Sequence, residues 1–203
     1  MPTATFPRSG EAIGAATVSQ MFESHQLSED VSMRLLRLSD ATALAAAYVR
    51  NRAHLAPWEQ VRPEEYFTET WQANDIASRL ISSEAGYGHP FGLFDEDVLV
   101  GRFNLAGIVR GPFQSAGLGY WMDSAYAGRG LASAAVQALV ETGREELGLH
   151  RIEASTLLDN AGSQRVLQKA GFQQIGMAPR YLQIAGRWQD HNLYQVVLHD
   201  SGV

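Results

Sequence analysis

The chain has 203 residues, of which 45% are hydrophobic and 19% charged, which is ordinary for a soluble globular protein of one domain. Its formal net charge of −6 disfavours a nucleic-acid binder, which normally carries a basic face, and is compatible with a cationic partner. The absence of cysteine excludes disulfides, thiolate metal sites and thiol nucleophiles, and no apolar run reaches the roughly 18 residues of a membrane helix.

The chain is predicted to form one α/β-mixed domain over residues 30–203, preceded by an arm over residues 1–29. The arm is rich in Ala, Ser, Thr, Gly and Pro, and is predicted to be flexible or to hold a short helix. It lacks the charged-then-apolar order of a signal peptide, so we expect a cytoplasmic protein.

Apolar periodicity and turn residues predict alternating strands and helices along the domain. The predicted elements are, in chain order, a strand at 31–38, a helix from Ser39-Asp40 to Pro57, a helix from Pro63 to about Ala85, a hairpin at 91–109, a strand at 116–122, a helix from the following glycine loop to about Leu147, a strand at 151–157, a short helix at 160–170, and strands at 172–175, 181–184 and 193–198.

The segment from Leu118 to Ala132, LGYWMDSAYAGRGLA, runs from an aromatic strand through a glycine loop into an alanine-rich helix. Gly128 and Gly130 flank Arg129, so backbone N–H groups can converge at the positive end of the helix dipole. Such a junction is an anion site, most naturally for phosphate. A lone G-x-G is a weak signal, because an ordinary strand-to-helix turn with a surface arginine has the same pattern.

The ordered segments RNRAHLAPWE, GYWMDSAYAGRGLASAAV, HRIEASTLLDNAGSQRVLQKAGF and YLQIAGRWQDHNLY carry a more specific signal. Over residues 31–198 the chain resembles the GNAT acyl-CoA N-acetyltransferases, and within them the ribosomal-protein-alanine N-acetyltransferases of the RimJ/RimL type, most like RimJ. The resemblance implies the GNAT fold, a mixed and mostly antiparallel sheet with a splayed parallel strand pair and flanking helices. Ala125 stands where the superfamily has Gln or Arg, which shifts phosphate binding onto backbone amides.

The resemblance implies that acetyl-CoA is the cofactor, with its pyrophosphate at the glycine loop and its pantetheine arm beside the preceding strand. The implied contacts are Trp121, Met122, Asp123, Ala127, Gly128, Arg129, Gly130, Leu131, Ala132, Asn160, Ser163 and Arg165. Some of these residues have simpler roles as alternatives: Asn160 as a helix cap, Arg165 as a solvated side chain, and Trp121 and Met122 as core residues.

Two residues are candidates for acid–base chemistry. The resemblance places Ser163 near the thioester sulfur, where a hydroxyl can protonate the departing thiolate. Glu59, in a loop after the first helix, is the candidate general base, or else it binds the incoming ammonium group. Some RimL-type enzymes have a glutamate where this chain has Arg180, so that carboxylate cannot be carried over.

Aromatic residues are expected to line the acceptor groove, namely Trp58, Phe113 and Tyr120. In the W-x-D-H segment, His191 can relay protons, but Asp190 and His191 are more readily explained as residues that hold a hairpin together. The six histidines show no metal-ligand spacing, so no metal site is expected.

The predicted reaction is direct transfer of acetyl from acetyl-CoA to a primary amine. By resemblance, the favoured acceptor is the N-terminal α-amine of a protein, in particular a ribosomal protein. Two alternatives stay open: acetylation of a small-molecule amine such as an antibiotic or metabolite, and a non-catalytic acetyl-CoA-binding module. We expect no nucleic-acid or membrane partner, and a monomer or homodimer.

Overall fold

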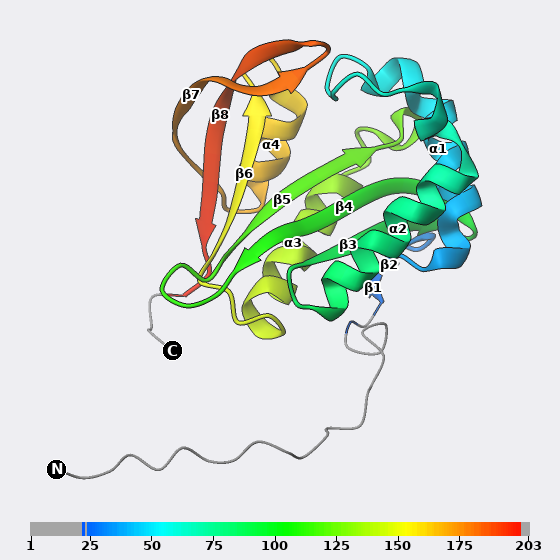
Figure 1. The fold of residues 1–203 in the computed structure, drawn as a ribbon. Coiled ribbons are helices and arrows are strands. Elements are labelled where there is room, and N and C mark those ends of the chain that lie inside the picture. Colours follow the sequence, from blue (N-terminus) through cyan, green and yellow to red (C-terminus); the bar gives the residue numbers. More distant parts are fainter. Residues whose placement is uncertain (1–21, 23, 200–203) are drawn as a thin grey trace, which may run out of the picture.

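A computed structural model describes Phe22 and residues 24–199. Its centre is an eight-stranded sheet in the order β1-β2-β3-β4-β5-β6-β8-β7 (Figure 1). The strands are β1 (His25–Gln26), β2 (Val31–Leu35), β3 (Gly88–Asp95), β4 (Val98–Val109), β5 (Ser115–Met122), β6 (Arg151–Leu157), β7 (Gln173–Ile184) and β8 (Arg187–Val197). All neighbours are antiparallel except β5 and β6, which confirms the predicted mixed sheet with one parallel pair.

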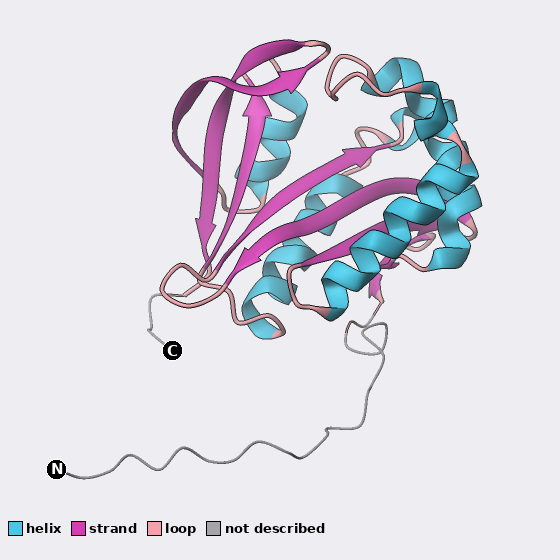
Figure 2. Ribbon diagram, viewed as in Figure 1, coloured by secondary structure: helices cyan, strands magenta, loops and turns pink. Residues whose placement is uncertain are grey.

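Four α-helices cover the two faces of the sheet (Figure 1, Figure 2). They are α1 (Ala41–Leu55), α2 (Glu69–Glu84), α3 (Leu131–Glu145) and α4 (Ala161–Lys169). α1 and α2 pack on one face, where Leu44 and Ile76 are fully buried, and α3 and α4 pack on the other, where Leu139 and Leu167 are fully buried. Successive side chains of a strand point to opposite faces, so each central strand contributes to both cores.

The parallel pair is short. β5 and β6 pair only from Ser115 with Arg151 to Gly117 with Glu153, and beyond these three residue pairs the strands diverge (Figure 2). Their carboxyl ends therefore enclose an opening inside the sheet, bordered by the first turns of α3 and α4 (Figure 1). This opening is the main feature that the fold provides for a functional site.

The structure differs from the predicted elements in several places, among them the start of β8 at Arg187, six residues before the strand predicted at 193–198. The helix expected from Pro63 is a 3₁₀ turn followed by α2, because Thr68 is extended and its hydroxyl caps α2 by accepting from Trp71 N. The two strands expected at 172–175 and 181–184 are one strand, β7, in which a register shift between Ala178 and Leu182 accommodates Pro179. A sequence pattern broken by proline does not reveal such continuity.

The expected arm at 1–29 also needs adjustment. β1 lies inside it and pairs with β2, and Phe22 is buried against Phe91 in the core on the α3 side. Residues 1–21 and 23, where a short helix was expected, lie outside the described residues. Among the helices of the described part, none is long and apolar enough to cross a membrane.

Candidate active site

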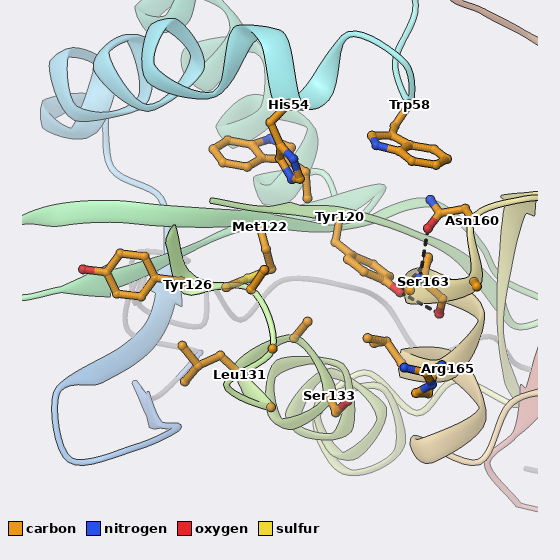
Figure 3. Close-up of a pocket in the computed structure, with 18 of the residues that line it drawn as sticks. His54, Trp58, Tyr120, Met122, Tyr126, Leu131, Ser133, Asn160, Ser163 and Arg165 are labelled. Carbon is orange, nitrogen blue, oxygen red and sulfur yellow. Dashed lines mark hydrogen bonds between the residues drawn. The ribbon is translucent and has the colours of Figure 1, made fainter. Parts of the chain in front are cut away.

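A groove of about 620 Å³ occupies the opening between β5 and β6 (Figure 3). It is lined by the end of α1, the end of β5, the glycine loop, and the first turns of α3 and α4. The lining residues are His54, Leu55, Trp58, Tyr120, Trp121, Met122, Tyr126, Ala127, Gly128, Gly130, Leu131, Ala132, Ser133, Asp159, Asn160, Ala161, Gly162, Ser163, Arg165, Val166 and Lys169. Most of the residues expected to bind acetyl-CoA are therefore brought together here.

The glycine loop leaves the start of α3 free for a ligand. Gly128 and Gly130 have φ angles of +78° and +82°, a region that side-chain-bearing residues rarely adopt. Gly130 is the N-cap of α3 and supplies no side-chain acceptor to the first turn. A Cβ at either glycine would meet no described protein atom within 4 Å, and both glycines line the groove, so the space beside the loop is open. The loop therefore fits a pyrophosphate.

Asp123 anchors this loop to α1. Its buried carboxylate accepts from Arg50 Nε (2.7 Å), Asn51 Nδ2 (2.8 Å) and Ala125 N (2.9 Å), while Asn51 Oδ1 accepts from Ser124 N (3.0 Å). Burial by itself raises the pKa of Asp123, but these hydrogen bonds hold it below the ordinary value. Asp123 does not line the groove, and its hydrogen bonds fix the loop, so its contact with acetyl-CoA stays a prediction.

Ser163 and Tyr120 meet at the centre of the groove (Figure 3). Their hydroxyl oxygens are 2.8 Å apart, and the Tyr120 ring stacks on Phe103 with centroids 5.0 Å apart. Burial raises the pKa of Tyr120 to about 12, so the phenol stays protonated at neutral pH. Asn160 Oδ1 accepts from Ser163 N at 3.0 Å, so Asn160 caps α4 and also lines the groove. Tyr120 was expected to bind substrate, and its contact with Ser163 is new.

Trp121 lines the groove, as expected, whereas two other expected contacts, Arg129 and Phe113, do not. The Trp121 side chain is buried in the core beneath α1, where Nε1 donates to Tyr48 Oη at 3.0 Å. Arg129 is exposed and lies over the Tyr126 ring, outside the groove lining. Phe113 lies in the turn before β5, at the opposite end of that strand from the groove. A turn residue next to a strand in the sequence can be a full strand length away from the site.

Nine residues that line the groove were not singled out by the sequence, and five of these carry polar or charged side chains: His54, Tyr126, Ser133, Asp159 and Lys169. Lys169 is the only one with a visible sequence signal, because it follows Arg165 by four residues and so shares its helix face. Together Arg165 and Lys169 give the α4 side of the groove two positive charges, which suit phosphate groups. Among the described residues there is no cluster of three or more side chains that could hold a metal ion.

The loop after α1 separates two predicted site residues. Trp58 lines the groove, whereas Glu59 faces a second, polar pocket of about 160 Å³, which Tyr120 and Trp121 also border. Burial raises the pKa of Glu59, and the positive charges of Arg62 and Arg102 only partly offset this effect. The turn between β7 and β8 holds the loop in place, because Ala185 N donates to the Glu59 carbonyl oxygen at 2.9 Å.

The β7–β8 hairpin is also secured from within. Asp190 Oδ1 accepts from Arg180 N at 2.8 Å, and His191 Nδ1 lies 3.0 Å from the Gln189 carbonyl oxygen. Neither Asp190 nor His191 lines the groove. These contacts agree with the structural interpretation of the W-x-D-H segment.

Comparisons with known proteins agree with this geometry. The sequence profile of the acetyltransferase (GNAT) domain matches residues 30–173. The ribosomal protein uS5-alanine N-acetyltransferase of Escherichia coli (strain K12) is 35% identical over 171 residues, which are 83% of this chain and 88% of that protein.

Two solved structures are similar over most of their length. The ribosomal-protein-S5-alanine acetyltransferase from Vibrio fischeri superposes with a TM-score of 0.85 and 32% identity, covering 88% of this chain and 98% of that one. RimJ from Mycobacterium smegmatis in complex with CoA-disulfide has a TM-score of 0.79 and 29% identity, covering 82% of this chain and 81% of that one. The domain profile, the identity and the shared fold lead to one conclusion: this chain belongs to the GNAT acetyltransferase family.

Proposed function

We propose that this protein transfers the acetyl group of acetyl-CoA to the N-terminal α-amine of a protein, in the cytoplasm, with a ribosomal protein as the favoured acceptor. The observation that carries the proposal is the groove at the β5–β6 opening, with an uncapped helix start on one side and Glu59 in the adjoining polar pocket. The acceptor is inferred from the relatives, which are named for acetylating ribosomal proteins.

The groove offers acetyl-CoA a binding site along its whole length. The N–H groups around Gly128 and Gly130 fit the pyrophosphate, and Arg165 and Lys169 add positive charge. Within the described residues, no strand pairs with the edge of β5 that faces β6 beyond Gly117, so the amide groups of the pantetheine arm can bind there as an added strand would. The thioester would then lie near Ser163.

The chemistry requires two proton transfers. The acceptor amine attacks only when neutral, and Glu59, with its raised pKa, is the base that accepts its proton. When the carbon–sulfur bond breaks, the thiolate takes a proton from the Ser163 hydroxyl, which Tyr120 holds in position. Much of the rate comes from holding the two substrates together, since the acetyl group passes directly between them.

A small-molecule amine is the second candidate acceptor, because the polar pocket has only about 160 Å³. The test is thiol release from acetyl-CoA with a panel of acceptors: peptides with ribosomal-protein N-termini, the same peptides with blocked N-termini, and small amines. Selective turnover of free peptide N-termini supports the proposal. Selective turnover of small amines favours the second candidate, and acetyl-CoA binding without turnover of any amine contradicts both.

Replacing Ser163 by Ala should lower kcat by about 100-fold, in line with the usual contribution of a general acid. The KM for acetyl-CoA should stay unchanged, because the α4 cap uses the backbone N–H of Ser163. Steady-state kinetics of thiol release measures both constants. Ser163→Thr keeps a hydroxyl and should have most of the wild-type activity. An unchanged kcat in Ser163→Ala would exclude Ser163 as the general acid.

Replacing Glu59 by Gln should lower kcat by about 100-fold and change the pH dependence. In the wild type, the rate should fall as the pH decreases through the pKa of Glu59, which lies above the ordinary glutamate value of about 4.3 because of burial. Glutamine does not titrate, so this acidic limb should disappear. A pH–rate profile that superimposes on that of the wild type excludes Glu59 as the base.

A further inference from the structure

The polar pocket contains an unusual concentration of unpaired polar atoms. It lies between helices α1 and α2 and strands β4 and β5, on the sheet face opposite α3. Seven buried side-chain nitrogen or oxygen atoms of the described residues have no hydrogen-bond partner, and three of them belong to this pocket: Arg62 Nε, Arg102 Nε and Asn104 Oδ1. Each unpaired buried polar atom is unfavourable for the folded state, so water or a ligand that pairs with these atoms stabilises the folded protein.

The surrounding contacts hold these atoms in place. The Arg62 guanidinium lies over the Tyr66 ring at 4.2 Å, and its Nε is 3.6 Å from Glu59, beyond hydrogen-bond length. Arg102 is only 2% exposed, and its Nη2 donates to Asp75 at 2.5 Å, which leaves Nε unused. The guanidinium groups are therefore oriented by their other contacts.

Asn104 lies opposite a residue without a side chain. Its partner on β5 is Gly119, and a Cβ at Gly119 would meet no described atom within 4 Å, so nothing fills this position on the sheet face. Tyr120 and Trp121, which follow on β5, border both this pocket and the groove, so a ligand held here lies next to the site of acetyl transfer.

The unpaired atoms have complementary chemistry. Asn104 Oδ1 and the Glu59 carboxylate accept hydrogen bonds, and the two arginine Nε–H groups donate them. A matching ligand carries an amine and, close to it, an oxygen that accepts hydrogen bonds. The start of a polypeptide has this arrangement, because two carbon atoms join its α-amine to its first carbonyl oxygen. A lysine side chain has only methylene groups next to its amine.

We propose that the polar pocket recognises the first residue of the acceptor as an α-amino amide, and so distinguishes α-amines from side-chain amines. Asn104 and Glu59 accept from the amine, and Arg62 donates to the first carbonyl oxygen, supported by Arg102. This inference rests on the proposed function, since it concerns the acceptor of the same reaction. Arg62 and Asn104 thereby become specificity-determining residues.

The test compares two acceptors, alaninamide and isopropylamine, which share the amine but differ in that a methyl group replaces the carboxamide. Arg62→Gln should lower kcat/KM for alaninamide about tenfold more than for isopropylamine, the effect of one lost charge-assisted hydrogen bond. Asn104→Ala should lower kcat/KM for both acceptors. Arg52→Gln is the matched control, because Arg52 pairs with Glu64 on the surface and does not line the polar pocket.

The ratio of the two kcat/KM values is the decisive quantity, since changes at Glu59 or in stability act on both acceptors equally. A ratio that Arg62→Gln leaves unchanged overturns the inference. Calorimetric titration of alaninamide into the protein with CoA present separates this outcome from failure of the proposed function. Binding that Arg62→Gln weakens, without turnover in the wild type, contradicts the proposed function but supports the pocket; neither binding nor turnover overturns both.

Discussion

Replacing Gly128 by Val should raise the KM for acetyl-CoA by about 100-fold, which corresponds to about 2.7 kcal/mol of lost binding. Gly128 has a φ angle of +78°, which a β-branched residue does not adopt without strain, so the loop must change shape. The new side chain would also enter the open space in front of the α3 start. Both effects remove charge-assisted hydrogen bonds between backbone N–H groups and the pyrophosphate.

Gly111→Val is the matched control for this experiment. Gly111 has a φ angle of +72° and open space around its Cβ position, but it lies in the turn before β5, away from the groove. It should therefore lose a similar amount of stability, measured by thermal unfolding, and keep the wild-type KM. If folded Gly128→Val also keeps the wild-type KM, the glycine loop does not bind the pyrophosphate.

Replacing Asp123 by Ala should lower the free energy of unfolding by about 3 kcal/mol, because its buried carboxylate accepts charge-assisted hydrogen bonds from Arg50, Asn51 and Ala125. The variant leaves the buried Asn51 amide and Arg50 without their acceptor. For a chain of this length the melting temperature should fall by about 10 °C. The KM for acetyl-CoA should rise as well, because the Asp123 contacts fix the start of the glycine loop.

The effect of Asp123→Ala should depend on pH in a defined direction. The pKa of Asp123 is lowered in the folded protein, so its contribution is full above the ordinary aspartate pKa of about 3.9. It is lost as the pH falls through the lower pKa of the folded state, and there the variant and the wild type should converge. Glu64→Ala removes an exposed ion pair with Arg52 and should leave the melting temperature unchanged. Equal melting temperatures for Asp123→Ala and the wild type at neutral pH would contradict the anchoring role.

Local patterns predicted much of this molecule. β6 has the predicted bounds, β4 ends where the predicted hairpin ends, and the glycine loop joins β5 to α3 as expected. These features depend on residues close together in the sequence, where turn chemistry and periodicity are informative. The same holds for Asn160 and Ser163, which a single helix start brings together.

The rest depends on contacts between distant segments. Asp123 stands in the sequence between a strand and the glycine loop that both line the groove. Its carboxylate nevertheless points toward α1, because it accepts hydrogen bonds from Arg50 and Asn51, more than 70 residues earlier. Phe113 is an aromatic residue of the kind that lines acceptor sites, but it precedes the first residue of β5, and the groove lies at the last residues of that strand. The polar pocket combines residues of α2, β4 and β5 with the loop after α1, and no local pattern reports that three of its atoms lack partners.

The short pairing of β5 with β6 also has a thermodynamic consequence. The sheet has an edge in its interior, since no strand in the described part of the chain pairs with β5 on that side beyond Gly117. A molecule that occupies this edge binds the folded chain and not the unfolded one. Above its Kd, it therefore raises the free energy of unfolding in proportion to the logarithm of its concentration. The melting temperature of the protein is therefore itself a measure of occupancy, and can rank ligands of the groove before any acceptor is known.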